Sequence, residues 1–295
     1  MTQKLIGIGE LLWDLLPGGR QLGGAPANFA HHAHQLGAAA AVVSCVGDDP
    51  AGHEILDLLR RRGIVTDAIA IHPTLPTGTV TVEILPDGQP KFTIHEEVAW
   101  DHLSCGAVEL EAVSGAAAIV FGTLAQRSAQ SRQAIWQLLA AIPAATLRVF
   151  DINLRQHYHS REVIEDGLRA ADVLKLNDAE LAILSPLLGL AGTECEQLAQ
   201  LAGEYGLALI ALTRGAGGSL LFAGGQSSDH PGFPTAVVDT VGAGDAFTAC
   251  LTLGWLQRWE LDRINRRANE LAAFVCSQPG ATPDLPAAMR EWFNA

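Results

Sequence analysis

Short apolar runs alternate along this chain with segments whose apolar residues recur at helical spacing. The runs lie at residues 5–9, 41–46, 117–122, 147–151, 173–176 and 207–213. The helical patterns include residues 28–36, 52–62, 131–141 and 193–205. Continuous apolar runs of this length are typical of strands covered on both faces, which are parallel strands. The alternation therefore predicts an α/β fold with a parallel sheet, and it disfavours all-α and all-β folds.

One stretch breaks this alternation. Residues 77–85 and 91–95 each alternate small polar with apolar residues, and Pro86, Asp87 and Gly88 between them favour a turn. This pattern predicts an antiparallel hairpin with one solvated face. We expect a small β-sheet lid over a ligand cleft, formed by about 11–24 and 69–99. The alternative is an edge hairpin with no part in binding.

Charge and composition exclude several classes of protein. The chain has 295 residues, with 19 Lys and Arg against 32 Asp and Glu, so its formal net charge is −13. Such an excess repels a polyanion, so we expect no nucleic-acid partner. No stretch approaches the roughly 20 apolar residues of a membrane helix, and the N-terminal residues lack the pattern of a signal peptide. The five scattered cysteines suit a reducing compartment. We expect a cytoplasmic protein without a membrane partner.

The most informative motif is the glycine-rich segment 237–247, which precedes an apolar helical pattern at 248–256. Gly242 and Gly244 allow close backbone approach, and a helix N-terminus behind such glycines is a site for a phosphate. Asp245 follows directly, where its like charge would repel a phosphate. A general base that takes a proton from an attacking hydroxyl explains this carboxylate better. The alternative is an aspartate that only caps the helix.

A second glycine-rich turn opens a helix at residues 22–30. Gly23 and Gly24 let the backbone approach a polar ligand, and Asn28 offers both a donor and an acceptor. Upstream, Asp14 is an acceptor suited to sugar hydroxyls. The alternative for Asn28 is a helix cap. No GxxxxGK[ST] motif occurs, so the chain is not a P-loop enzyme.

Together these two segments resemble the two signatures of the ribokinase-like carbohydrate kinases of the phosphofructokinase-B superfamily. Residues 22–30 and 46–52 resemble the N-terminal signature, and 239–245 resemble the C-terminal one. Further landmarks appear in order, so the resemblance covers essentially the whole chain. It implies one ribokinase-like domain over 1–295, with a doubly wound, mostly parallel Rossmann-like sheet and a β-sheet lid. It also implies ATP and Mg²⁺, often with activation by K⁺.

The resemblance implies that residues in the second half of the chain bind the nucleotide. Thr213, Gly215 and Gly218 are similar to the family's nucleotide loop TxGxxG. Asn269 resembles a residue of the adenine-side helix. In the C-terminal signature, the backbone of Gly242, Ala243 and Gly244 would form the anion hole beside Asp245.

The resemblance also assigns the metal sites. Asn177 and Glu180 are similar to the NxxE motif, which organises Mg²⁺ and phosphate through water. Asp239, together with the loop at 275–284, would form a site for a monovalent cation.

Within this family the residues favour a fructokinase. Residues 151–155 resemble the fructokinase D-x-N-x-R stretch, which places Asn153 and Arg155 in the cleft. Arg155 could neutralise charge on the substrate or on the transferred phosphate, and its alternative is a surface ion pair. Residues 24–28 and 98–101 also resemble bacterial fructokinases. The chain has Ile152 where many fructokinases have proline, which leaves the sugar open.

We therefore expect an ATP-dependent kinase that converts D-fructose to fructose 6-phosphate, as a monomer or homodimer whose partners are the sugar and ATP. Asp14, Gly23, Gly24 and Asn28 would bind the sugar. A kinase of the same fold for ribose, a keto-deoxy sugar acid or a nucleoside is one alternative. A sugar-binding regulator without catalysis is another, although such a protein has no use for the base Asp245.

Overall fold

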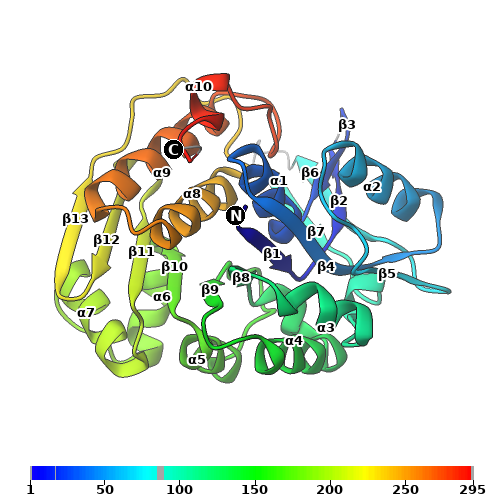
Figure 1. The fold of residues 1–295 in the computed structure, drawn as a ribbon, viewed down its shortest axis with the longest axis horizontal. Helices are drawn as coiled ribbons and strands as arrows, with labels where there is room; N and C mark the ends of the chain where they lie inside the picture. The colour runs from blue at the N-terminus through cyan, green and yellow to red at the C-terminus, as the bar shows by residue number, and fades with distance from the viewer. Residues whose placement is uncertain (1, 17, 85–89, 294–295) are drawn as a thin grey trace.

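A nine-stranded sheet forms the centre of the computed structural model, which describes residues 2–16, 18–84 and 90–293 (Figure 1). In spatial order its strands are β13 (Gln226–His230), β12 (Ser219–Ala223), β11 (Leu209–Thr213), β10 (Val173–Asn177), β9 (Leu147–Asp151), β8 (Ala118–Phe121), β1 (Lys4–Ile8), β4 (Ala39–Gly47) and β5 (Ile69–His72). The strands from β11 to β5 are parallel, and β12 and β13 add an antiparallel edge. The predicted α/β fold with a mostly parallel sheet is thereby confirmed.

A smaller sheet, which we call the lid, lies beside the main one. Within the described part of the chain its strands, in spatial order, are β3 (Gly19–Gly23), β2 (Leu12–Leu16), β6 (Gly78–Ile84) and β7 (Pro90–Ile94). The predicted hairpin is confirmed as the antiparallel pair of β6 and β7. The predicted turn at Pro86, Asp87 and Gly88 lies outside the described residues.

The predicted start of the second lid segment at residue 69 is wrong. Residues 69–72 form β5, which continues the parallel ladder of β4 from the pair Ser44–Ile69 onward. The backbone hydrogen bonds of this strand therefore belong to the main sheet, and the lid sheet begins only at Gly78.

Helices cover both faces of the main sheet (Figure 1). One face carries α1 (Ala25–Gln35), α2 (Pro50–Arg61), α8 (Ala243–Leu256), α9 (Leu261–Cys276) and α10 (Ala287–Arg290). The other carries α3 (Ala107–Ser114), α4 (Ala129–Ala141), α5 (Arg161–Ala170), α6 (Asp178–Leu188) and α7 (Glu194–Tyr205). Short 3₁₀ turns are η1 (Ala99–His102), η2 (Leu124–Arg127) and η3 (Gly215–Gly217). Among the described helices, none has the length and apolar composition needed to cross a membrane.

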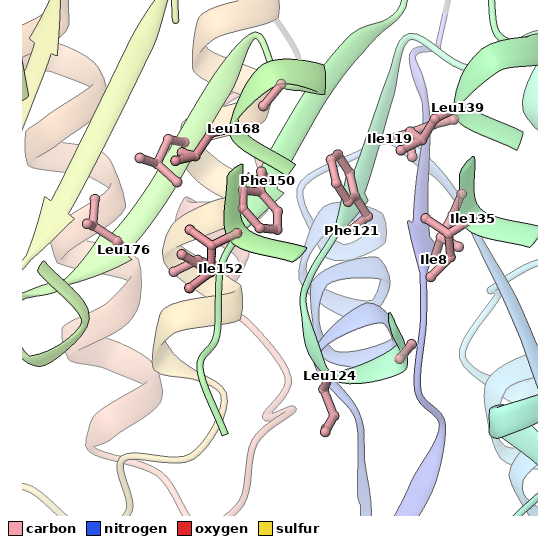
Figure 2. Close-up of a cluster of buried hydrophobic side chains, with 14 of the residues drawn as sticks. Ile8, Ile119, Phe121, Leu124, Ile135, Leu139, Phe150, Ile152, Leu168 and Leu176 are labelled. Atoms are coloured by element: carbon pink, nitrogen blue, oxygen red, sulfur yellow. The ribbon is translucent and has the colours of Figure 1, made fainter. Parts of the chain in front are cut away.

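Aromatic and aliphatic side chains fill the space between the sheet and the helices α4 and α5 (Figure 2). Phe121 on β8 and Phe150 on β9 stack with ring centroids 5.1 Å apart. Ile135 of α4 and Leu168 of α5 pack in the same cluster. These packed strands are rigid, and their carboxyl ends place the polar residues described below.

On the face opposite α4 and α5, two helices begin earlier than the apolar pattern predicts. Helix α1 begins at Ala25 because Pro26 is tolerated in a first turn, where its missing N–H has no partner to lose. Helix α8 begins at Ala243, directly after Gly242. Its residues 246–254 are all buried, as expected for a helix that is apolar on every side.

Candidate active site

The start of α8 forms a partly exposed set of backbone donors. Gly242 precedes the helix in the left-handed conformation, with φ of 79°, and a Cβ there would lie 2.3 Å from the carbonyl oxygen of Ala281. Only glycine fits this position. The first N–H groups of a helix have no partner within it, and no side chain of the described residues caps this helix. The backbone of Gly242, Ala243 and Gly244 can therefore bind an anion.

Asp245 lies in this first helical turn, as the sequence predicts. Its carboxylate accepts a hydrogen bond of 2.8 Å from the side-chain amide of Asn28 on α1. Burial raises the pKa of Asp245 to about 7, and the nearby charge of Asp151 acts in the same direction. The Asn28 hydrogen bond and the cations Lys175 and Arg155 lower this pKa. A base with a pKa near 7 is well suited to proton transfer at neutral pH.

A cavity opens at the carboxyl ends of β1, β8 and β9. The polar residues that line it beside Asp245 are Glu10 after β1, Thr123 after β8, Asp151 at the end of β9 and Asn153 after it. Open α/β sheets bind ligands at this edge. Asp245 therefore faces a space at the place where a substrate is expected.

Asp14 reaches the same region from lid strand β2. On β3, Gly23 pairs with Leu12, two residues before Asp14, and a Cβ at this glycine would come within 2.3 Å of Asp14 Oδ2. Gly24 has φ of 107°, and a Cβ there would lie 2.5 Å from the Glu10 carbonyl oxygen. The two glycines thus make room for the Asp14 carboxylate and for the tight entry into α1. Burial raises the pKa of Asp14 to about 6, which Arg155 opposes.

Asn28 is 4 % exposed and lies inside α1, so it does not cap the helix, whose N-cap is Gly24. Its Nδ2 atom bonds to Asp245, whereas its Oδ1 atom is buried without a hydrogen-bond partner among the described residues. A buried acceptor of this kind needs a partner. The residue therefore supports the carboxylate with one atom, and its other polar atom is left able to accept a hydrogen bond.

The loop after β9 carries Asn153 and Arg155. Asn153 has φ of 42°, an uncommon conformation for a residue other than glycine, and it lines the cavity. Arg155 is exposed and donates to the Leu154 carbonyl oxygen and, at 3.2 Å, to Asn153 Oδ1. Both acceptors are neutral, so neither of them neutralises the positive charge of the guanidinium.

The residues assigned to the nucleotide follow the neighbouring strands. Thr213 ends β11, Gly215 begins η3 and Gly218 follows it, and the two glycines have positive φ values of 53° and 79°. A Cβ at Gly218 would lie 1.9 Å from the His230 carbonyl oxygen. Asn269 on α9 is 7 % exposed and donates to Ser219 Oγ at 2.7 Å. The structure thus gives Asn269 a packing contact, and its role toward adenine stays a prediction.

Asn177 and Glu180 form the first turn of α6 as a reciprocal cap. The Glu180 backbone N–H donates to Asn177 Oδ1, and the Asn177 N–H donates to Glu180 Oε2, each at 2.8 Å. The other oxygen of Glu180 accepts the N–H of Leu154 at 2.9 Å. Each oxygen thus accepts one backbone N–H and keeps a lone pair, which can accept a further hydrogen bond such as one from a metal-bound water. The described residues contain no cluster of three metal-binding side chains.

Asp239 joins two loops beside α8. Its carboxylate accepts N–H groups of Val241 at 3.0 Å and Gly280 at 3.1 Å. The Cys276 carbonyl accepts the N–H of Val238, which holds the same two loops together. The carboxylate of Asp239 and the carbonyl of Cys276 thus belong to one hydrogen-bonded segment, and oxygen atoms of these kinds are the ligands that a hard cation prefers.

Sequence reasoning missed the buried charges under the site, Glu10, Asp151 and Lys175. Lys175 bonds to Asp151 at 3.1 Å, and both side chains are 4 % exposed. The available signal was a lysine inside the apolar run 173–176, because a charge in a covered strand requires a partner.

Comparison with known proteins agrees with this geometry. Residues 18–288 match the pfkB family of carbohydrate kinases. A fructokinase from Klebsiella pneumoniae is 30 % identical over 305 residues, which cover 97 % of this chain and 97 % of that protein. An uncharacterized sugar kinase from Pyrococcus horikoshii, solved in complex with ATP, superposes with a TM-score of 0.82 at 28 % identity and covers 94 % of both chains. The chain belongs to the pfkB family of carbohydrate kinases, as its motifs predict.

Proposed function

We propose that this kinase transfers the γ-phosphoryl group of ATP to the primary C6 hydroxyl of D-fructose and yields fructose 6-phosphate and ADP. Asp245 takes the hydroxyl proton as the oxygen attacks phosphorus. The bond from phosphorus to the bridging oxygen breaks, and ADP leaves with that oxygen. The backbone amides of residues 242–245 stabilise the charge on the moving phosphoryl group.

The sugar would bind beside Asp245, in the region between lid strand β2 and the carboxyl ends of the main-sheet strands. Asp14 accepts hydroxyl hydrogen bonds from the lid side, and the unpaired Oδ1 atom of Asn28 accepts another from the α1 side. Gly23 and Gly24 allow the sugar to approach the backbone. Asn153 and Arg155 bind from the β9 loop, with Arg155 neutralising phosphate charge. The 30 % identity to the Klebsiella fructokinase supports fructose as the acceptor.

ATP lies along the same sheet edge, against Thr213, Gly215, Gly218 and the helix of Asn269. The ATP complex of the Pyrococcus sugar kinase supports ATP as the donor. Asn177 and Glu180 would hold Mg²⁺ through water, and the ion would neutralise charge on the phosphates. Asp239 and the loop at 275–284 would hold K⁺ beside the anion hole.

The observation that carries the proposal is the position of Asp245, a carboxylate of pKa about 7 next to the first backbone amides of α8 and at the edge of a cavity. The test is a coupled assay of ADP release with the purified protein, ATP and Mg²⁺ over a panel of sugars. The panel contains fructose, ribose, a keto-deoxy sugar acid, a nucleoside and glucose. The product with the preferred sugar is identified by NMR.

The proposal predicts the highest kcat/KM with fructose and a phosphate on C6. A higher kcat/KM with another acceptor would replace fructose and keep the kinase reaction. Tight sugar binding without ADP release for any acceptor would indicate a regulator and contradict the proposed reaction.

A further inference from the structure

A buried ion pair lies directly under the start of α8. Lys175 on β10 donates to Asp151 Oδ1 at the end of β9 over 3.1 Å. Lys175 and Asp151 are each about 3 % exposed, and apolar residues surround them in their strands. An ionic pair taken out of water is often no more stabilising than a well-packed apolar pair. Fold stability alone therefore gives no reason for these two charges here.

The pair also contacts the reactive helix. Thr248, one turn after Gly244, donates to the second Asp151 oxygen at 2.7 Å. The Lys175 ammonium lies 3.0 Å from the point where a Cβ at Gly244 would be. The two charges thus touch the backbone and side chains of the turn that carries the anion hole and Asp245.

We propose that Lys175 and Asp151 are positioning residues for phosphoryl transfer, which hold the first turn of α8 against the sheet and supply opposed fixed charges that balance the Asp245 carboxylate. Asp151 fixes the helix through Thr248, and Lys175 supports the turn from below at Gly244. Their role in the reaction rests on the proposed function, whereas their effect on Asp245 does not require it.

Asp151 and Lys175 have opposite effects on the ionisation of Asp245. Asp151 on β9 disfavours its ionised form, while Lys175 on β10, Arg155 after β9 and the Asn28 amide on α1 favour it. Glu10 after β1 lines the same cavity, and burial raises the pKa of that side chain. Lys175 itself faces three carboxylates, those of Asp151, Asp245 and Glu180 on α6. Burial lowers the pKa of Lys175, but these carboxylates outweigh burial, and the pKa is raised.

The test compares the titration of Asp245 in Asp151→Asn, in Lys175→Met and in the double variant that carries both changes. Aspartate is labelled with ¹³C at its carboxyl carbon, and the Asp245 resonance is identified by its absence in Asp245→Asn. The titration is followed by NMR in the protein without ligands, so it needs no kinase activity. Lys4→Met is the matched control, because Lys4 is a strand lysine that bonds to the Ala112 carbonyl.

We expect the titration midpoint to fall in Asp151→Asn and to rise in Lys175→Met, each by half a pH unit or more. The double variant should lie between the two, and Lys4→Met should match the wild type. The acidic limb of the kcat/KM profile should move by the same amounts. If Lys175→Met does not fold, the step from Asp151→Asn to the neutral double variant tests the lysine, and the midpoint should rise in that step.

Midpoints that stay at the wild-type value, or that move in the same direction in both single variants, would overturn the inference. A wild-type protein that phosphorylates no sugar would contradict the proposed function instead, and the titrations would still decide the inference.

Discussion

Asn28 and Asp245 lie 217 positions apart in the chain, and the Asn28 amide donates a 2.8 Å hydrogen bond to the Asp245 carboxylate. The contact joins the first turn of α1 to the first turn of α8, and each helix follows a glycine-rich turn. It links the residue expected to bind sugar to the residue expected to accept the proton. Sugar binding and proton transfer are therefore expected to depend on one another at this contact.

Asp245→Asn tests the base. Asparagine keeps the size and most of the hydrogen bonding but cannot accept the proton, so kcat should fall at least about a hundredfold. KM for sugar and ATP should change only modestly. Steady-state kinetics and ligand titration of the folded variant measure this. More than about a tenth of the wild-type kcat, outside the usual range for a lost base, would contradict the mechanism.

Asn28→Ala tests the contact between the two turns. Its hydrogen bond favours the charged carboxylate, so its loss should raise the pKa of Asp245. The wild-type rate should increase with pH through about 7, as Asp245 ionises, and in the variant this increase should move to higher pH. The measurement is kcat/KM from pH 5 to 9. Gln35→Ala on the same helix is the control. If the increase of kcat/KM with pH stays at its wild-type position in Asn28→Ala, the contact does not set the pKa of the base.

Asp14→Ala tests the sugar site. The lost hydrogen bonds should weaken sugar binding by about 2 kcal/mol, which is about thirtyfold in KM, and KM for ATP should stay near its wild-type value. Burial raises the pKa of Asp14 to about 6, so the sugar KM of the wild type should also increase as pH falls below 6. A sugar KM unchanged in Asp14→Ala would remove Asp14 from the site.

Gly23→Ala tests the same site through its packing. The new Cβ would lie 2.3 Å from Asp14 Oδ2, so the carboxylate must move, and the sugar KM should increase at least about tenfold. Gly203→Ala is the control, because no atom lies within 4 Å of its added methyl group. That control should keep its kinetics and gain up to about 1 kcal/mol in free energy of unfolding. Wild-type kinetics for both variants would contradict the crowding argument.

Replacement of K⁺ by Na⁺ or choline tests the cation site. A cation at Asp239 would hold the loop that contacts Gly242 and thereby fix the amides of the anion hole. The loss of activity without K⁺ should therefore appear mainly in kcat, measured at constant ionic strength with both substrates saturating. Equal rates in K⁺ and choline would remove the cation site and leave the kinase reaction in place.

Local patterns in the sequence determined most of the fold. A covered strand must be apolar along its whole length and an amphipathic helix must repeat every 3.6 residues, so β1, β4, β8, β9, β10 and β11 were predictable. The remaining strands β5, β12 and β13 were not predicted as parts of the main sheet. The glycine motifs were equally visible, because a close backbone approach leaves no room for a Cβ, as at Gly23 and Gly242. Asp245 in a first helical turn followed from its motif alone.

Only the tertiary structure decided which distant side chains meet. The order of the strands places β9 beside β10, and this brings Asp151 to Lys175 under the helix of Asp245. The same packing turns Asn28 toward Asp245, and it assigns β5 to the main sheet because a free strand edge of β4 is available there. Strand propensity says nothing of the partner strand, and a buried charge shows its function only when its neighbours are known, since its energy depends on the charges and dipoles around it.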